Sequence, residues 1–177
     1  MFKVREGNLE RLGLLYERYK KILFTFFYRL NSDVYLSEDL VQNVFVRIIK
    51  YRHTFRGQGE FKTWMFHIAR NLSHEHYRRN SRKVSTERLQ LRHEALTDQA
   101  ELTGNTQKDH DLKLLNKALD GLSIEKREII LLSKIDGMKY KDIGQILNCT
   151  ESNVKIRAFR ALKELKSNFE KLKQYHE

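Results

Sequence analysis

No proline occurs in this 177-residue chain, and only eight of its residues are glycine. Proline and glycine most often mark the turns between short strands, so their scarcity disfavours a many-stranded fold. Apolar residues recur instead at helical spacing through most of the chain. An early example is the run Leu12, Leu15, Tyr16, Tyr19, Ile22, Leu23, Phe26 and Phe27. The sequence therefore predicts an all-α fold.

Composition divides this helical chain into two blocks. Residues 83–111 are rich in Ser, Thr, Gln, Glu and Asp and hold only scattered leucines, which is typical of a flexible linker. We therefore expect one small helical domain over residues 1–82, the linker over 83–111 and a second helical domain over 112–177. In the first domain, one helix is expected to open at Ser37 with acids in its first turn, and another to open at Phe61.

The clearest local motif runs from Tyr140 to Lys166. A short helix with Ile143 on its apolar face is followed by a break at Asn148-Cys149, and Thr150 can cap the next helix. The glycine at 144 leaves room for that helix to cross closely. The second helix has an apolar stripe of Val154, Ala158, Ala161, Leu162 and Leu165. Two such helices around a tight turn form the helix-turn-helix that reads the DNA major groove.

The net charge of +11 is concentrated in two segments. Residues 62–83 hold six Lys/Arg against one acid, and residues 139–173 hold nine against four, so each segment carries +5. The rest of the chain is close to neutral. Two basic patches on a neutral body favour two contacts with a polyanion such as a nucleic acid.

Several function classes have little support in the residues. No apolar run is long enough to cross a membrane, and the charged N-terminus lacks a secretory apolar segment. The single cysteine, Cys149, fits a reducing cytoplasm. His74-Glu75-His76 lacks metal-ligand spacing, and no acid/base or nucleophile set is visible, so we expect no metal, no cofactor and no enzymatic activity.

Three sequence blocks occur in a characteristic order: DLVQNVFVRIIKY, FRGQGEFKTWMFHIARNLSHEHYRR and, after the polar linker, GLSIEKREIILLSKIDGMKYKDIGQILNCTESNVKIRAFRALKEL. In this order they resemble the extracytoplasmic-function (ECF) sigma factors of bacterial RNA polymerase, within the sigma-70 family. The resemblance implies that the first domain is region 2 and the second is region 4. The sequence departs from the family pattern at Ser123, where proline is usual, and at Gly144, where alanine is usual.

The resemblance also implies site residues. Region 2 of the family binds and melts the −10 promoter element with a loop and the helix that follows it. The implied residues are Arg56, Gln58, Phe61, Lys62, Arg70, Asn71, His74, Arg78 and Arg79. Region 4 reads the −35 element in the major groove, which implies Ser152, Asn153, Lys155, Arg157 and Arg160. The first block docks on the polymerase, which implies Asp39, Gln42, Asn43 and Val46.

The expected partners are therefore core RNA polymerase, double-stranded and melted promoter DNA, and an anti-sigma factor, which in this family is often membrane-bound. Two rivals remain open at this stage. One is an ordinary helix-turn-helix regulator that acts without a sigma role. The other is a nucleic-acid-processing enzyme with two basic domains.

Overall fold

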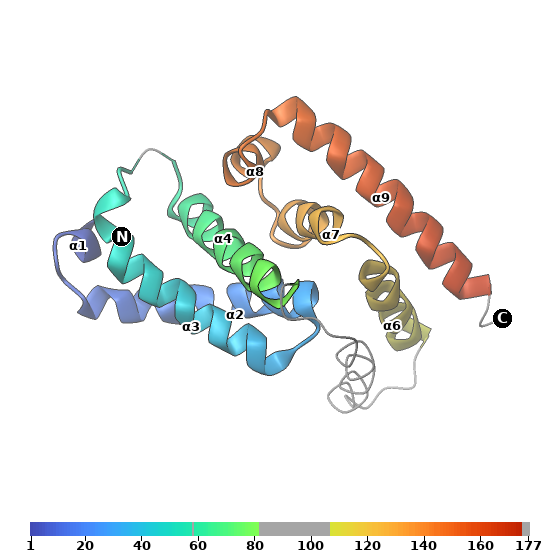
Figure 1. Cartoon of the computed structure of the whole chain (residues 1–177), viewed down its shortest axis with the longest axis horizontal. Coiled ribbons are helices and arrows are strands. Elements are labelled where there is room, and N and C mark those ends of the chain that lie inside the picture. Colours follow the sequence, from blue (N-terminus) through green and yellow to red (C-terminus); the bar gives the residue numbers. More distant parts are fainter. Residues whose placement is uncertain (58, 82–106, 175–177) are drawn as a thin grey trace. The chain divides into compact units, whose positions relative to one another are not determined.

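The computed structural model describes residues 1–57, 59–81 and 107–174, and this part of the chain is helical and contains no strand. It divides into two compact units (Figure 1). The first unit holds α1 (Phe2–Arg5), α2 (Glu10–Asn31), α3 (Val34–Tyr51), the 3-10 turn η1 (Arg52–Thr54) and α4 (Phe61–Ser81). The later helices are α6 (Gln107–Asp120), α7 (Ile124–Ile130), α8 (Tyr140–Leu147) and α9 (Glu151–Gln174), with a π-helical turn η3 (Leu131–Ile135) after α7. The predicted all-α fold is confirmed.

The core of the first unit forms where α3 packs against both α2 and α4 (Figure 1). It is built from the apolar stripes that helical spacing predicts. The buried side chains include Leu23, Phe26 and Phe27 of α2, Leu40, Val44, Phe45 and Ile48 of α3, and Met65, Ile68, Ala69 and Leu72 of α4. Full burial of each larger side chain contributes roughly 1.5–3 kcal/mol. Trp64 of α4 is only half buried.

The helix that we expected to open at Ser37 begins earlier, at Val34, so that prediction was wrong. Asp33 is the N-cap residue, and its carboxylate accepts a hydrogen bond from the backbone N–H of Leu36 at 2.9 Å. Ser37 is buried inside the helix, where its hydroxyl donates to the Asp33 carbonyl. An aspartate in extended conformation at this position satisfies an orphan N–H, which is why the helix starts there.

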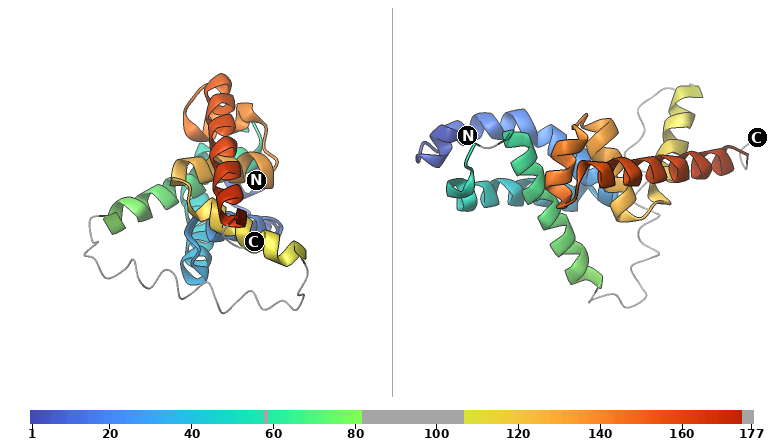
Figure 2. Two further views of the ribbon diagram at one scale, coloured as in Figure 1. Left: turned by 90° about the vertical axis from the view of Figure 1, so that its right-hand side faces the viewer. Right: turned by 90° about the horizontal axis from the view of Figure 1, so that it is seen from above.

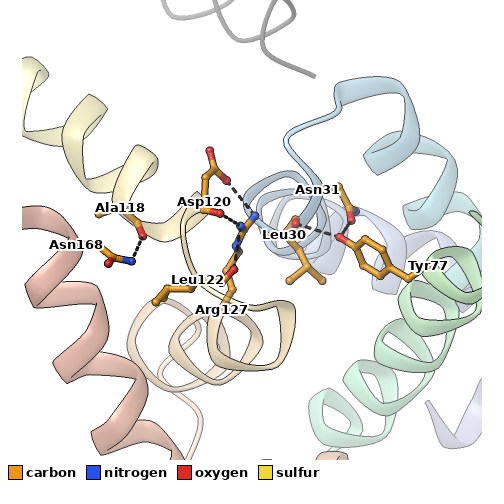
Figure 3. Close-up of polar contacts among 8 residues, drawn as sticks. All are labelled: Leu30, Asn31, Tyr77, Ala118, Asp120, Leu122, Arg127 and Asn168. Atoms are coloured by element: carbon orange, nitrogen blue, oxygen red, sulfur yellow. Dashed lines mark hydrogen bonds and ion pairs between the residues drawn. The ribbon is translucent and has the colours of Figure 1, made fainter. Parts of the chain in front are cut away.

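Tyr77 connects the C-terminal half of α4 to the end of α2 through hydrogen bonding (Figure 3). Its hydroxyl donates a hydrogen bond to the Leu30 carbonyl at 3.1 Å and also contacts the side-chain oxygen of Asn31. Asn31 is buried, so the contact gives a polar group in the core a partner. The basic end of α4 is therefore held to the core of its unit.

In the second unit, α6 and α7 both pack against α9. A cluster of Leu119, Leu122, Ile130 and Ala161 lies at their junction, and Leu162 and Leu165 pack against it as their spacing predicts. Arg127 is buried beside the α6–α7 turn, where it pairs with Asp120 at 2.9 Å and donates to the Asp120 carbonyl at 2.7 Å (Figure 3). The turn between these helices is thereby held by a charged group as well as by apolar packing.

The helix-turn-helix forms as predicted. The first helix, α8, ends at Leu147, and its C-cap residue Asn148 adopts a left-handed conformation with φ 52°. Thr150 accepts a hydrogen bond from the backbone N–H of Asn153 at 3.2 Å, which confirms its expected role as a cap. A Cβ at position 144 would lie 2.7 Å from the Cys149 carbonyl oxygen. The backbone of the turn therefore occupies the space that a side chain would need. From this turn α9 runs as one long helix (Figure 2).

The predicted linker, residues 83–111, lies outside the described residues except for its last five, which belong to α6.

Candidate nucleic-acid interfaces

An open hollow of about 930 Å³ lies between α3 and α4. Four of the residues expected at the −10 element line it together: Arg70, Asn71, His74 and Arg78. They are brought together because positions 70, 74 and 78, and the neighbouring 71, recur at helical spacing along one side of α4. The structure therefore brings these four side chains to one surface.

Sequence reasoning missed other residues that line this hollow. They are Arg47, Tyr51 and Thr54 from the end of α3 and η1, and Trp64, His67, Ile68 and Glu75 from α4. The side-chain amide of Asn71 lies 3.4 Å from Nδ1 of His67, one turn earlier. The sequence could have indicated His67, because positions 67, 71, 74 and 78 recur at helical spacing. Nothing in the sequence showed that the end of α3 would meet this side of α4.

A two-bond ion pair joins the two helices at the hollow. The Arg47 guanidinium donates to the Glu75 carboxylate, from Nη1 to Oε1 at 2.9 Å and from Nη2 to Oε2 at 2.5 Å. Hydrogen bonding to Arg47 lowers the pKa of Glu75, and the nearby charges of Arg47, Arg79 and Arg78 lower it further. The same hydrogen bond raises the pKa of Arg47. Because the charges of Arg47 and Glu75 cancel, the net positive charge of the hollow comes from Arg70 and Arg78.

The remaining expected −10 residues lie outside the lining of the hollow. Arg56 is exposed on the loop before α4, and Arg79 is exposed near the end of α4. The ring of Phe61 is half buried in an aromatic cluster, 5.3 Å from Tyr19 between ring centroids. The Lys62 ammonium lies 5.8 Å from the Phe66 ring centroid. Gln58 lies outside the described residues.

All five residues expected to read the −35 element are exposed on the N-terminal half of α9: Ser152, Asn153, Lys155, Arg157 and Arg160. Lys155 pairs with Glu151 one turn earlier at 2.9 Å. Two large apolar residues that sequence reasoning left out are exposed there too, Ile156 at 53% and Phe159 at 70%. The sequence could have indicated their exposure, because both fall outside the buried stripe of Val154, Ala158 and Ala161.

The third expected surface lies on α3. Asp39, Gln42 and Val46 are exposed, and Asn43 is half buried. The side-chain amide of Asn43 donates to the carbonyl and to the carboxylate of Asp39, both at 2.9 Å. Tyr35, near the start of the same helix, is also highly exposed. The described helix therefore presents a mixed polar and apolar surface.

No group of three or more His, Cys, Asp and Glu residues in the described part of the chain is placed to hold a metal ion. None of the helices described is both long enough and apolar enough to span a membrane.

Comparison with known proteins defines the class to which these surfaces belong. The family described as Sigma-70 region 2 matches residues 15–83, and the family described as Sigma-70, region 4 matches residues 112–165. The first match contains α3, α4 and the hollow, and the second contains the helix-turn-helix. The chain thus contains two regions of a sigma-70-type transcription factor.

Individual relatives narrow the class. The chain is 30% identical over 168 residues to the ECF RNA polymerase sigma factor SigX of Bacillus subtilis, covering 93% of this chain and 87% of that protein. It is 25% identical over 177 residues to the ECF sigma factor SigW of the same organism, covering 96% and 95%. The chain therefore belongs to the ECF RNA polymerase sigma factors. It is an alternative sigma factor, which acts with RNA polymerase in promoter-specific initiation of transcription.

A solved structure has the same fold over nearly the whole chain. It is the co-crystal structure of the sigma factor RpoE with the anti-sigma factor NepR from Bartonella quintana. The two chains share 25% of their residues with a TM-score of 0.74, covering 91% of this chain and 98% of the other.

Proposed function

We propose that the two basic surfaces of this sigma factor divide promoter recognition between them. The exposed half of α9 reads the −35 element as duplex, and the hollow between α3 and α4, with the loop before α4, binds the −10 element once it is unpaired. The observation that carries this proposal is the separation of the two surfaces into different units. We propose residues 83–111 as the connection between them.

For the −35 element, α9 offers the side chains that major-groove readout requires. The guanidinium groups of Arg157 and Arg160 match the two acceptors of guanine, while Lys155 suits a phosphate. Ile156 and Phe159 are exposed to solvent between these cations, and apolar side chains in a major groove contact the thymine methyl group. We expect Ser152 and Asn153 to meet phosphates or base edges near the start of the helix.

For the −10 element, the hollow supplies what an unstacked strand needs. Tyr51 and Trp64 offer aromatic surfaces, Asn71 offers an amide, and Arg70 and Arg78 offer positive charge. Stacking on aromatic rings and contact with cationic side chains are the main means of holding single strands. Arg56 and Lys62 extend the positive charge to the loop and to the first turn of α4.

For the polymerase, the exposed residues of α3 provide the docking surface. Asp39, Gln42 and Asn43 supply polar contacts, and Val46 supplies the apolar centre that such surfaces contain. We propose that the chain has no catalytic activity and acts in the cytoplasm, where the polymerase performs the chemistry. We propose an anti-sigma factor as its inhibitor, because a related sigma factor of the same fold has been crystallised with one.

In vitro transcription tests this division. Core RNA polymerase and the purified protein are mixed with a library of promoter fragments, and each component is omitted in turn. We expect specific start sites that require this protein and share a −35 and a −10 motif. Duplex binding without polymerase-dependent start sites would instead support an ordinary helix-turn-helix regulator.

A further inference from the structure

The N-terminal turn α1 packs against the loop that leads into α4. Val4 is fully buried, which anchors the turn to its unit. The Arg5 guanidinium donates a hydrogen bond from Nη1 to the Phe55 carbonyl oxygen at 3.2 Å. The Phe2 ring lies 5.4 Å from the Phe55 ring, between centroids, and the Arg5 guanidinium lies 5.3 Å from the Phe2 centroid. Residues about fifty positions apart are therefore joined by two contacts, and the local contact of Arg5 with the Phe2 ring links them.

Phe2 also lies directly against the backbone of the loop. A Cβ built on Gly57 would lie 2.3 Å from Cζ of Phe2, far inside van der Waals contact. Gly57 has φ +74° and Gly59 has φ +100°, conformations that side-chain-bearing residues rarely adopt. Two glycines make this loop costly to order, because glycine loses the most backbone entropy on folding. Contacts from outside the loop are therefore important for holding it in one conformation.

The same contacts continue into the start of α4. Phe55 is buried, and its ring lies 6.0 Å from Phe61 and 5.5 Å from Trp64 between centroids. Phe2 is thus the most exposed ring of a cluster that includes Phe55 and Phe61, the residues just before Arg56 and Lys62. Phe2 itself is 50% exposed, so the fold of the unit depends little on it. Its ring lies against Phe55 and Gly57, both of which belong to the loop.

We infer that Phe2 and Arg5 are positioning residues for the −10 element: they hold the loop at residues 55–57, and with it Arg56 and the first turn of α4, in the conformation that receives the unpaired strand. This inference rests on the proposed −10 role of that loop. Neither residue needs to touch DNA for this effect. A binding group works only when its supporting contacts fix it within a fraction of an ångström.

The test uses Phe2→Ala and Arg5→Ala, with Leu14→Ala as the matched control. Leu14 is an exposed apolar residue of α2 in the same unit, so its truncation removes a similar surface without touching the loop. Phe2→Leu is the conservative variant, because it keeps an apolar side chain beside Gly57. Each variant is assembled with core polymerase and assayed for open-complex formation, for binding of a −35 duplex and for binding of the core enzyme.

Trp64 provides a readout that does not depend on activity, because it is the only tryptophan in the chain. Its ring contacts Phe55, so a displaced loop changes its fluorescence and its quenching by acrylamide. We expect Phe2→Ala and Arg5→Ala to increase quenching and to lower open-complex formation about 2- to 10-fold, the factor that one aromatic pair or one hydrogen bond supports. Binding of −35 duplex and of core enzyme should stay unchanged, and Phe2→Leu should recover part of the loss.

The outcomes separate this inference from the proposed function. If Arg56→Ala and Lys62→Ala lower open-complex formation while Phe2→Ala and Arg5→Ala alter neither Trp64 nor open complexes, the positioning role is overturned and the −10 role of the loop stands. If Phe2→Ala alters Trp64 but none of the four variants lowers open-complex formation, the −10 role of the loop is wrong, and the positioning role is overturned with it.

Discussion

We predict that one substitution in the Arg47–Glu75 pair lowers the stability of the protein but adds a contact to DNA. In Glu75→Gln the carboxylate is removed, so the two hydrogen bonds between α3 and α4 are weakened and Arg47 loses its counter-charge. The side chains are 27% and 34% exposed, which screens the pair. Exposed ion pairs stabilise by about 0.2–1 kcal/mol, and two-bond geometry places this pair near the top of that range. We expect a loss of about 1 kcal/mol.

For a unit of this size, a loss of that magnitude lowers the melting temperature by about 4–8 °C. The effect has a defined pH dependence. The pKa of Glu75 is lowered in the folded protein, so its contribution is present above the ordinary value of 4.5 and is lost as the pH falls through the folded value. The difference in unfolding free energy between wild type and Glu75→Gln should therefore shrink below about pH 4.5, as measured by urea titration.

DNA binding should change in the other direction, because Arg47 lines the hollow and becomes available to a phosphate. Each phosphate neutralised on a single strand changes the slope of log K against log salt by about 0.7. Holoenzyme with Glu75→Gln should thus bind a single-stranded −10 oligonucleotide with a slope steeper by about 0.7. Glu17→Gln removes the same charge from an exposed pair on α2 and serves as the control. Equal slopes for both variants would refute the assignment of the hollow to the −10 strand.

Three other changes test the remaining surfaces. Arg157→Ala and Arg160→Ala should each weaken −35 duplex binding by roughly 1–3 kcal/mol in a salt-controlled titration. Lys171→Ala, near the end of the same helix, is the control and should have little effect. Unchanged promoter use in both arginine variants would contradict base readout. Asn71→Ala should reduce −10 melting, followed by permanganate footprinting, more than it reduces −35 binding, and equal losses would count against its −10 role. Thr150→Ala removes the cap of α9 and should destabilise the protein by about 1 kcal/mol in urea unfolding; an unchanged midpoint would show that the cap contributes nothing.

Arg47 illustrates how the site differs from its sequence-based description. Its position on the helix predicts exposure to solvent, and its neighbours Gln42 and Val46 are indeed exposed. The structure instead pairs Arg47 with an acid 28 residues later. The two polar residues could be assigned to each other only once α3 and α4 were known to pack together.

The sequence by itself determined most of the helices and buried stripes, the turn at Asn148 and the cap at Thr150. These features depend on residues within one or two helical turns, so their periodicity and chemistry are visible in the chain. The motif order also identified the family, and the resemblance implied Arg70, Asn71, His74 and Arg78 among the −10 residues. Only the tertiary structure decided the hollow between α3 and α4 and the contact of Phe2 with Phe55 and Gly57. Those features join side chains from separate elements, and which elements meet is set by the packing of the whole unit.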